Sequence, residues 1–404
     1  MHDTELFQLA LGLVQPWLVS DSRFDAEKKR LDIDIDFTKG SHFDCSGCGK
    51  PDCAVHDTVQ KEWRHLDFFQ HQAFLHARVA RTKCDDCGVR LVNVPWARPG
   101  SGFTLLFEAL AMTLVTAMPV RAAARLVGEH DTRLWRVIIH YVEQALARAD
   151  FSKVMRIAVD ETASKRGHNY ITLFVDIDER RVLFVADGKD ARTIEAFADD
   201  LEAHGGDASR IKEVCIDMSA AFIKGVTENL TEAQITFDKF HAVKLVNDAV
   251  DKVRRAEVKD RPELRRSRYL WLKNERNLSA NQSAQLGCLS ARNLKTARAY
   301  NLRLAFQDIY TEPSMAWGEL FLDRWYSWAR RCRLEPMKQV ALTINKHRDG
   351  ILRWFDSRIA NGLIESINSL IQAAKAKARG YRTTKNLKAI TYLIAGKLDL
   401  RLPT

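Results

Sequence analysis

Residues 154–160 read VMRIAVD, and residues 213–217 read EVCID. Each is a short apolar run that stops at an aspartate, Asp160 in the first and Asp217 in the second. A short apolar run bounded by polar residues is typical of a buried strand. In a parallel pair of such strands, the residues that follow them meet at one edge of the sheet. We therefore expect the two aspartates to lie close together.

The neighbouring segments predict more of the same sheet. The apolar patterns indicate strands at 170–176, 181–186 and 234–237, and helices at 191–204 and 219–229. Three antiparallel strands followed by helix, strand, helix and strand is the element order of an α/β fold of the RNase H type. We place the first part of this RNase H-like core at 152–244.

The chain beyond His241 shows no strand pattern as far as residue 350. Residues 245–350 read as helices rich in Arg and Lys, which predicts an all-helical insertion. The core is expected to resume at 351–404, where a last helix carries Glu365. We expect the tryptophans of the insertion to pack its interior, with Trp325 and Trp328 on one buried helical face. Stacking on an extruded base is the alternative.

Asp160, Asp217 and Glu365 form a set with a definite chemistry. Carboxylate oxygens are ligands that suit Mg²⁺ or Mn²⁺, which keep waters and substrate phosphate as further ligands. Two such ions, roughly 3.5–4 Å apart, activate a water or a 3′-hydroxyl and stabilise the leaving oxygen of a phosphodiester. Glu335 and Asp356 are weaker candidates for the third carboxylate, because neither lies in a recognisable motif.

Five of the eight cysteines fall between Cys45 and Cys87. Two CxxCG motifs stand out, Cys45 with Cys48 and Cys84 with Cys87, in which the glycine lets backbone amides face the thiolates. Four such sulfurs predict a closed and therefore structural Zn²⁺ site, in a zinc-ribbon domain at 41–98. A rival ligand set stays open at this point, made of Cys45, Cys48, Cys53 and His56, with His42 as a further candidate.

Two further segments flank this domain. Residues 1–40 predict an N-terminal helix and a strand at 30–37, whose alternating aspartates are expected to be solvated. Residues 103–148 predict three helices with Gly128 at the last turn, the pattern of a helix-turn-helix DNA-binding domain. Arg133 and Arg136 would then lie on the helix that enters the major groove. A plain helical linker domain is the alternative.

The charge of the chain is unevenly distributed. Between Lys239 and Thr404 there are 33 Lys+Arg against 15 Asp+Glu. This excess predicts a polyanion partner, nucleic acid above all, and the alternative is that these charges form solvated helix faces. Five residues of the C-terminal segment are expected to contact DNA phosphates, namely Lys375, Lys377, Arg379, Arg382 and Lys385. The longest apolar stretch, 103–120, is interrupted by Glu108 and Pro119. We therefore expect no membrane span and a cytoplasmic protein.

Four short motifs together resemble one known family. They are IAVDET at 157–162, IDMS at 216–219, DKFH at 238–241 and NGLIESIN at 361–368. With the zinc ribbon and the helix-turn-helix, they are similar to the DDE transposases of bacterial insertion sequences in the group called ISL-three. The resemblance covers essentially the whole chain.

The resemblance implies roles for particular residues. Asp160, Asp217 and Glu365 would be the catalytic triad that binds Mg²⁺ or Mn²⁺. Asp238 and His241 match a DxxH signature near the active site, and we assign them a supporting or proton-handling role. The family usually has Gly after the glutamate, whereas Ser366 stands here, a mild change on a helix.

These observations lead to one functional expectation with two alternatives. We expect a DNA transposase that binds the terminal inverted repeats of its element, cleaves the DNA and transfers the strand to target DNA. It is expected to act as a homodimer on double-stranded DNA in the bacterial cytoplasm, associated with the nucleoid. The alternatives are a DNA-binding regulator with an inactive nuclease-like domain, and an RNase H-like nuclease without strand transfer, such as a junction resolvase.

Overall fold

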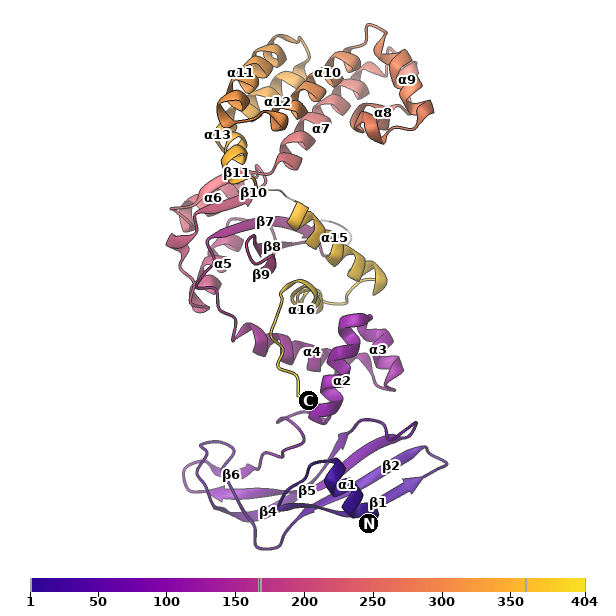
Figure 1. Ribbon diagram of the computed structural model, residues 1–404, viewed down its shortest axis with the longest axis vertical. Coiled ribbons are helices and arrows are strands. Elements are labelled where there is room, and N and C mark those ends of the chain that lie inside the picture. Colours follow the sequence, from indigo (N-terminus) through magenta and orange to yellow (C-terminus); the bar gives the residue numbers. More distant parts are fainter. Residues whose placement is uncertain (1, 166, 168, 360–361, 404) are drawn as a thin grey trace. The chain divides into compact units, whose positions relative to one another are not determined.

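The computed structural model describes residues 2–165, 167, 169–359 and 362–403 (Figure 1). It contains two compact units. The first comprises Met1–Ala145 together with Asp399–Thr404, and the second comprises Leu146–Leu398. Each unit is described by itself below. No helix among the described residues is long and apolar enough to cross a membrane.

A six-stranded sheet forms most of the first unit, with the order β1-β2-β5-β4-β3 and β6 paired to β5. Alternate apolar residues of β2 are buried on one face, as the sequence predicts, while its aspartates on the other face form ion pairs, such as Asp36 with Arg78. Because β2 pairs with β5, the sheet joins the segments that the sequence analysis separates at residue 40. The elements are α1 (Asp3–Ala10), β1 (Trp17–Asp25), β2 (Arg30–Phe37), β3 (His42–Phe43), β4 (Cys53–Arg64), β5 (Gln72–Cys84) and β6 (Gly88–Leu91).

Three helices complete the first unit, close to the predicted positions. They are α2 (Leu105–Ala117), α3 (Val120–Leu126) and α4 (Asp131–Leu146). The Thr104 side chain caps α2 by accepting a hydrogen bond from the Phe107 amide. Gly128 has a φ of +69° between α3 and α4, a conformation that glycine adopts without strain.

The second unit is built on a five-stranded sheet with the order β11-β10-β7-β8-β9. Strands β7, β8 and β9 are antiparallel neighbours, whereas β10 and β11 run parallel to β7. This is the predicted α/β core. Its elements are β7 (Arg156–Ala163), β8 (Tyr170–Asp176), β9 (Arg181–Asp187), α5 (Arg192–Ala203), η1 (Ala208–Arg210), β10 (Glu213–Ile216), α6 (Ala220–Asn229) and β11 (Gln234–Phe237).

One strand boundary differs from the prediction. We expected the first strand to end at Asp160, but β7 continues to Ala163 because residues beyond Asp160 still pair with β8. The parallel pairing of β7 with β10 does stop before Asp160, at Ala158. Asp160 therefore lies at the end of the parallel part of the sheet and within the antiparallel part.

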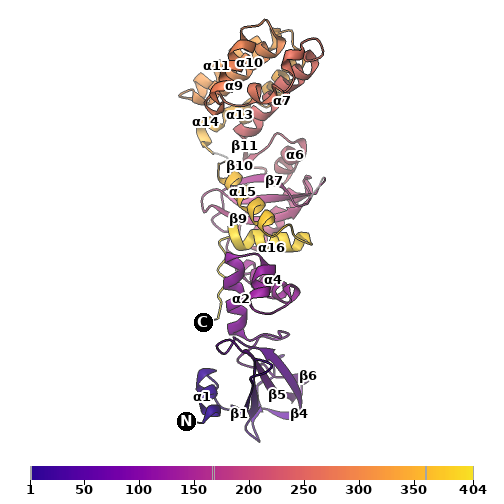
Figure 2. The ribbon, with the colours of Figure 1, turned by 90° about the vertical axis from the view of Figure 1, so that its right-hand side faces the viewer.

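The helical insertion begins directly after β11, and Figures 1 and 2 show its helices grouped beyond the β10–β11 side of the sheet. Trp271 and Trp325 are buried in its core, but Trp317 and Trp328 are 56% and 46% exposed. The expectation that Trp328 shares the buried face of Trp325 is wrong, because Leu322, Trp325 and Ala329 already form that face. The elements are α7 (Lys239–Glu257), η2 (Pro262–Leu264), α8 (Arg268–Leu272), η3 (Glu275–Asn277), α9 (Ala280–Ser290), α10 (Lys295–Asp308), η4 (Ile309–Thr311), α11 (Met315–Arg331), α12 (Glu335–Lys346), α13 (Arg348–Leu352) and α14 (Trp354–Ser357).

The chain then returns to the sheet through α15 (Gly362–Lys377) and α16 (Thr384–Ala395). Helix α15 packs beside β7 (Figure 1). Helix α16 packs against the edge strand β9, where the Val185 amide donates a hydrogen bond of 2.9 Å to the Tyr392 hydroxyl. This contact satisfies a backbone group that an edge strand would otherwise leave unpaired.

Candidate active site

Three aspartates form a row across the parallel strands. In the register of the sheet, Ala158 on β7 is paired with Cys215 on β10, so Asp160 and Asp217 each lie two residues beyond one paired position. Ile216 is paired with Phe237 on β11, which puts Asp238 level with Asp217. Residues two apart on a strand point to the same face. The topology thus places these three aspartates on one face, at the same edge of the sheet.

Asp238 and His241 form a tight pair at the start of α7. Asp238 is 3% exposed and caps the helix by accepting hydrogen bonds from the amides of Phe240 and His241. Its Oδ2 also lies 2.7 Å from Nδ1 of His241. The DxxH spacing produces this geometry, because the side chain of an N-cap residue reaches the first turn of its helix.

Helix α15 is fastened to β7 through one of its faces. The Asn368 side-chain amide donates a hydrogen bond of 2.7 Å to Oδ2 of Asp160. One turn later, Gln372 Nε2 donates to Thr162 Oγ1 at 2.7 Å, and Lys375 Nζ donates to the Ala163 carbonyl at 2.6 Å. Sequence reasoning missed Asn368 and Gln372. Their spacing of three and seven residues from Glu365, on one helical face, was the available signal.

Glu365 lies in the first turn of α15 and is exposed. It precedes Asn368 by three residues and so shares the helix face that meets Asp160. Neither Glu365 nor the aspartate row forms a compact cluster of ligand atoms: in the described part of the chain, four cysteines form the only His/Cys/Asp/Glu group whose ligand atoms all lie within 4.8 Å of one another. Asn361, which opens the NGLIESIN motif, lies outside the described residues.

The electrostatics of the row are those of crowded carboxylates. Burial raises the pKa of Asp160, and the negative charges of Asp238 and Asp217 raise it further. The hydrogen bond from the Glu161 amide and the charge of His241 lower this pKa, but the net shift is upward. Burial by itself lowers the pKa of His241, but its bond to Asp238 and the nearby aspartates bring the net pKa above its ordinary value. A cation placed among these groups would relieve the repulsion.

Glu161 is a further carboxylate next to this row. Sequence reasoning expected it to point away from Asp160, and its carboxylate lies 3.8 Å from Lys189. Burial raises the pKa of Glu161, and the charges of Asp217 and Asp160 also raise it. The negative charges of the row therefore extend to Glu161.

The two CxxCG motifs meet as one cluster. The sulfurs of Cys45, Cys48, Cys84 and Cys87 all lie within 4.8 Å of one another, which fits a structural Zn²⁺ ion. The amides of Cys48 and Gly47 lower the pKa of Cys45 to about 6, so this thiol is prepared to ligate as a thiolate. This agrees with the expectation from the CxxCG motifs that backbone amides face the thiolates.

The rival zinc ligands have other contacts. Cys53 is buried beside the cluster, with its sulfur 3.5 Å from the Lys50 carbonyl. His42 and His56 lie beside the carboxylates of Asp52 and Asp57. The structure therefore selects the two matched knuckles over the rival set.

The predicted reading helix contains two arginines in different situations. Arg136 is exposed on α4. Arg133 instead makes an ion pair of 2.6 Å with Glu129, donates to the Gly102 carbonyl and lies over the ring of Phe103. Arg133 thus helps to hold the helices to the linker, which leaves Arg136 as the better-placed candidate for DNA.

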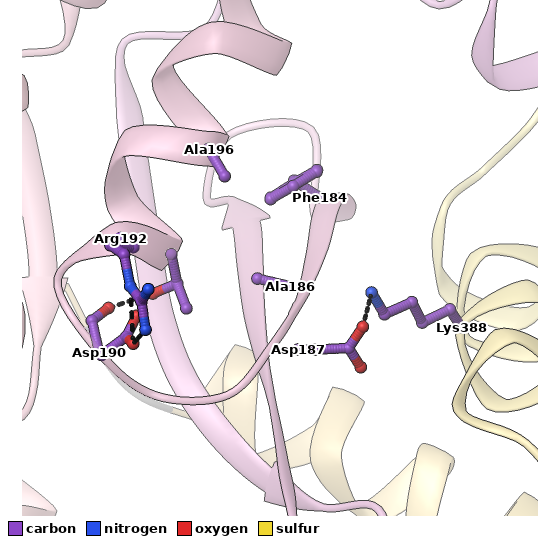
Figure 3. Close-up of a pocket in the computed structure, with 8 residues that line it drawn as sticks. Phe184, Ala186, Asp187, Asp190, Arg192, Ala196 and Lys388 are labelled. Atoms are coloured by element: carbon purple, nitrogen blue, oxygen red, sulfur yellow. Dashed lines mark hydrogen bonds and ion pairs between the residues drawn. The ribbon is translucent and has the colours of Figure 1, made fainter.

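Two surface hollows lie on the second unit. One is lined at the start of α5 and the end of β9, where its charged residues pair with each other, Asp187 with Lys388 and Asp190 with Arg192, as Figure 3 shows. Its charges are balanced, so it attracts neither anions nor cations strongly. The other hollow lies at the end of α15 and includes Lys375 and Arg379 among the predicted DNA contacts.

The sequence matches the models of known protein families. A family model described as a transposase matches residues 157–391, which include the aspartate row and α15. The chain belongs to the ISL3 family of transposases. The helix-turn-helix domain of transposase family ISL3 matches residues 92–142, and the zinc-finger of transposase IS204/IS1001/IS1096/IS1165 matches residues 42–87.

Two curated relatives agree with this assignment along most of their length. The chain is 29% identical to the transposase for insertion sequence element IS1557 of Mycobacterium tuberculosis, over 97% of this chain and 96% of that protein. It is 30% identical to the transposase for IS1001 of Bordetella parapertussis, over 84% of this chain and 85% of that protein. This ISL3 transposase is accordingly a DNA-binding enzyme that cleaves and transfers DNA with a divalent metal.

Proposed function

We propose that this ISL3 transposase binds the terminal inverted repeats of its insertion sequence and cleaves and transfers strands through Asp160, Asp217 and Glu365. The observation that carries the proposal is the register of the sheet, which aligns Asp160 with Asp217, together with the hydrogen bond from Asn368 that fastens the Glu365 helix to Asp160. Glu365 lies one helix turn before Asn368, which supports its assignment to the same end of the sheet.

The residues present fit a pair of hard divalent cations. The donors are carboxylate oxygens, which Mg²⁺ and Mn²⁺ prefer, and the row has more negative than positive charge. In addition, Oδ1 of Asn368 is buried and accepts no hydrogen bond from a described residue. A buried acceptor without a partner is consistent with a group that binds there. When bound, Mg²⁺ or Mn²⁺ would activate the attacking oxygen and stabilise the leaving one.

The protein's own groups position this chemistry. Asn368 orients the Asp160 carboxylate, and the Ser219 amide orients Asp217 through a hydrogen bond of 2.8 Å. Asp238 holds the His241 ring by Nδ1, so the remaining ring nitrogen, Nε2, is the one available to accept or give up a proton near the row. We assign His241 this proton-handling role, with Asp238 as its support.

DNA recognition is assigned to three parts of the chain. Arg136 on α4 reads the inverted repeat, the zinc ribbon adds a second module, and the basic residues from Lys375 to Lys385 contact phosphates of the repeat and the target. Two element ends must be held together for transposition, so we assign a homodimer on DNA, acting on the bacterial nucleoid.

The test is a cleavage assay on DNA that carries the inverted repeats flanking the gene, with Mg²⁺ or Mn²⁺. Wild type is compared with Asp160→Asn, which keeps the shape but removes a charge, and with Asp178→Asn as a control from the β8–β9 turn. We expect metal-dependent cuts at the repeat boundary in wild type and the control only. Specific binding by all three proteins without cutting by any of them would favour the regulator.

A further inference from the structure

Beside the Glu365 helix lies a basic hollow of about 380 Å³. Its wall comes from two segments, the turn that follows β7 and the end of α15. The residues that line it are Ser164, Lys165, Gln372, Lys375, Ala376, Arg379, Gly380 and Tyr381. Three of them are cations and none is a carboxylate, in contrast to the balanced hollow of Figure 3.

The three cations of this hollow outweigh the partial negative charge at the C-terminal end of α15. The end of a helix carries about half a negative charge, which by itself disfavours an anion. Lys165, Lys375 and Arg379 supply three formal positive charges against it. Lys375 is also fixed in place, since its Nζ donates to the Ala163 carbonyl at 2.6 Å. A fixed cation loses less side-chain entropy when it binds an anion.

The hollow lies beyond Asp160 along β7 and α15, whereas the aspartate row runs across the strands. Asp160 and Ser164 are separated by four residues of β7 and its turn, or about 13 Å at roughly 3.3 Å per residue. Along α15, Asn368 touches Asp160 and Lys375 lines the hollow, a separation of about 10 Å at 1.5 Å per residue. A B-form strand rises about 3.4 Å per nucleotide along its axis and also winds around that axis, so this span corresponds to no more than about four nucleotides.

We propose that this hollow binds one backbone phosphate of the DNA strand being cut, within about four nucleotides of the bond that is cleaved. The ligand class is a phosphodiester within a strand, and the role is to fix the register of that strand on the aspartate row. The proposal rests on the proposed function, because it takes the cleaved bond to lie at Asp160 and Asp217.

A charge-scanning experiment tests the proposal on the full-length protein. The probes are duplexes that carry the inverted repeat flanking the gene, each with a single phosphate replaced by a neutral methylphosphonate. Binding is measured for wild type, for the double variant Lys165→Gln/Arg379→Gln, and for Lys212→Gln, a control at the opposite end of β10 from Asp217. Lys375 is left unchanged because of its contact with the sheet.

For wild type and the control, we expect neutralising the phosphate at one position within about four nucleotides of the cut to lower the affinity roughly tenfold. In the double variant that position should matter no more than its neighbours, and the slope of log K against log salt should fall by about 0.9 for the lost phosphate. If binding is specific for the repeat but the double variant shows the same dependence on each phosphate as wild type, the phosphate site is wrong and the proposed function stands. Absence of any preference for the repeat over a scrambled duplex would overturn the proposed function, and the site with it.

Discussion

Asn368 links helix α15, which carries Glu365, to the sheet, and the two polar atoms of its side chain lie in different surroundings. Its nitrogen donates to Asp160, while its buried oxygen accepts no hydrogen bond from the described residues. A buried polar atom left without a partner costs about 1–3 kcal/mol. Such a cost is usual where a site is completed by a group that binds later.

Removing this side chain is predicted to impair the reaction more than the fold. We expect Asn368→Ala to lower the cleavage rate by about 10- to 100-fold, the usual effect of losing a group that orients a metal ligand. The control is Ser366→Ala, because Ser366 is exposed on the same helix and bonds only to the Leu363 carbonyl among the described contacts. Cleavage rates are measured at several Mn²⁺ concentrations. Equal rates for the two variants and wild type would remove Asn368 from the site.

At the scale of elements, the apolar patterns predicted the sheet, the three front-end helices and the helical insertion. These patterns report which faces are buried, and burial dominates the placement of strands and helices. Other features depended on contacts between distant residues. The extension of β7 to Ala163 is set by pairing with β8, and the exposure of Trp328 by how α11 packs. The aspartate row was predictable, whereas the contact of Asn368 with Asp160 was not.

The cysteine knuckles supply a prediction for the zinc ribbon. We expect Cys84→Ser to abolish stable zinc binding, because a closed site needs all four of its sulfurs. Cys53→Ser is the matched control, since Cys53 is also buried beside the cluster but bonds to backbone carbonyls. Zinc per chain is measured after gel filtration with a mild chelator. Loss of zinc from the Cys53 variant and retention by the Cys84 variant would reverse the ligand assignment.

Substitutions of the two arginines of α4 are expected to have different effects, one on DNA binding and the other on thermal stability. Arg136→Gln is expected to weaken repeat binding and reduce its salt dependence by about one phosphate, or to relax the sequence preference at one position. Arg133→Gln is expected instead to lower the thermal unfolding temperature, because it removes the contacts with Glu129 and Phe103. Fluorescence anisotropy and thermal melts give the two readouts. Weaker binding by the Arg133 variant at unchanged stability would assign that residue to DNA.

In the whole molecule, the charge distribution and the family matches both distinguish the first unit from the second. The first unit holds the zinc ribbon and the helix-turn-helix, and the second holds the aspartate row and the basic hollow. The excess of Lys and Arg lies after residue 238, within and behind the catalytic core. This distribution supports the proposal that the second unit binds DNA through its own basic residues and that the first unit recognises sequence.

If the aspartate row holds the catalytic metal, replacing one of its carboxylates by a thiolate should change which metal ion supports cleavage. Mg²⁺ requires oxygen ligands, whereas first-row ions such as Mn²⁺ accept sulfur more readily. Repeat cleavage is measured for Asp217→Cys in Mg²⁺ and in Mn²⁺, beside Asp178→Cys as the control. The account predicts that the Asp217 variant is inactive in Mg²⁺ and partly active in Mn²⁺, while the control cuts in both. Equal activity of the Asp217 variant in the two metals would contradict it.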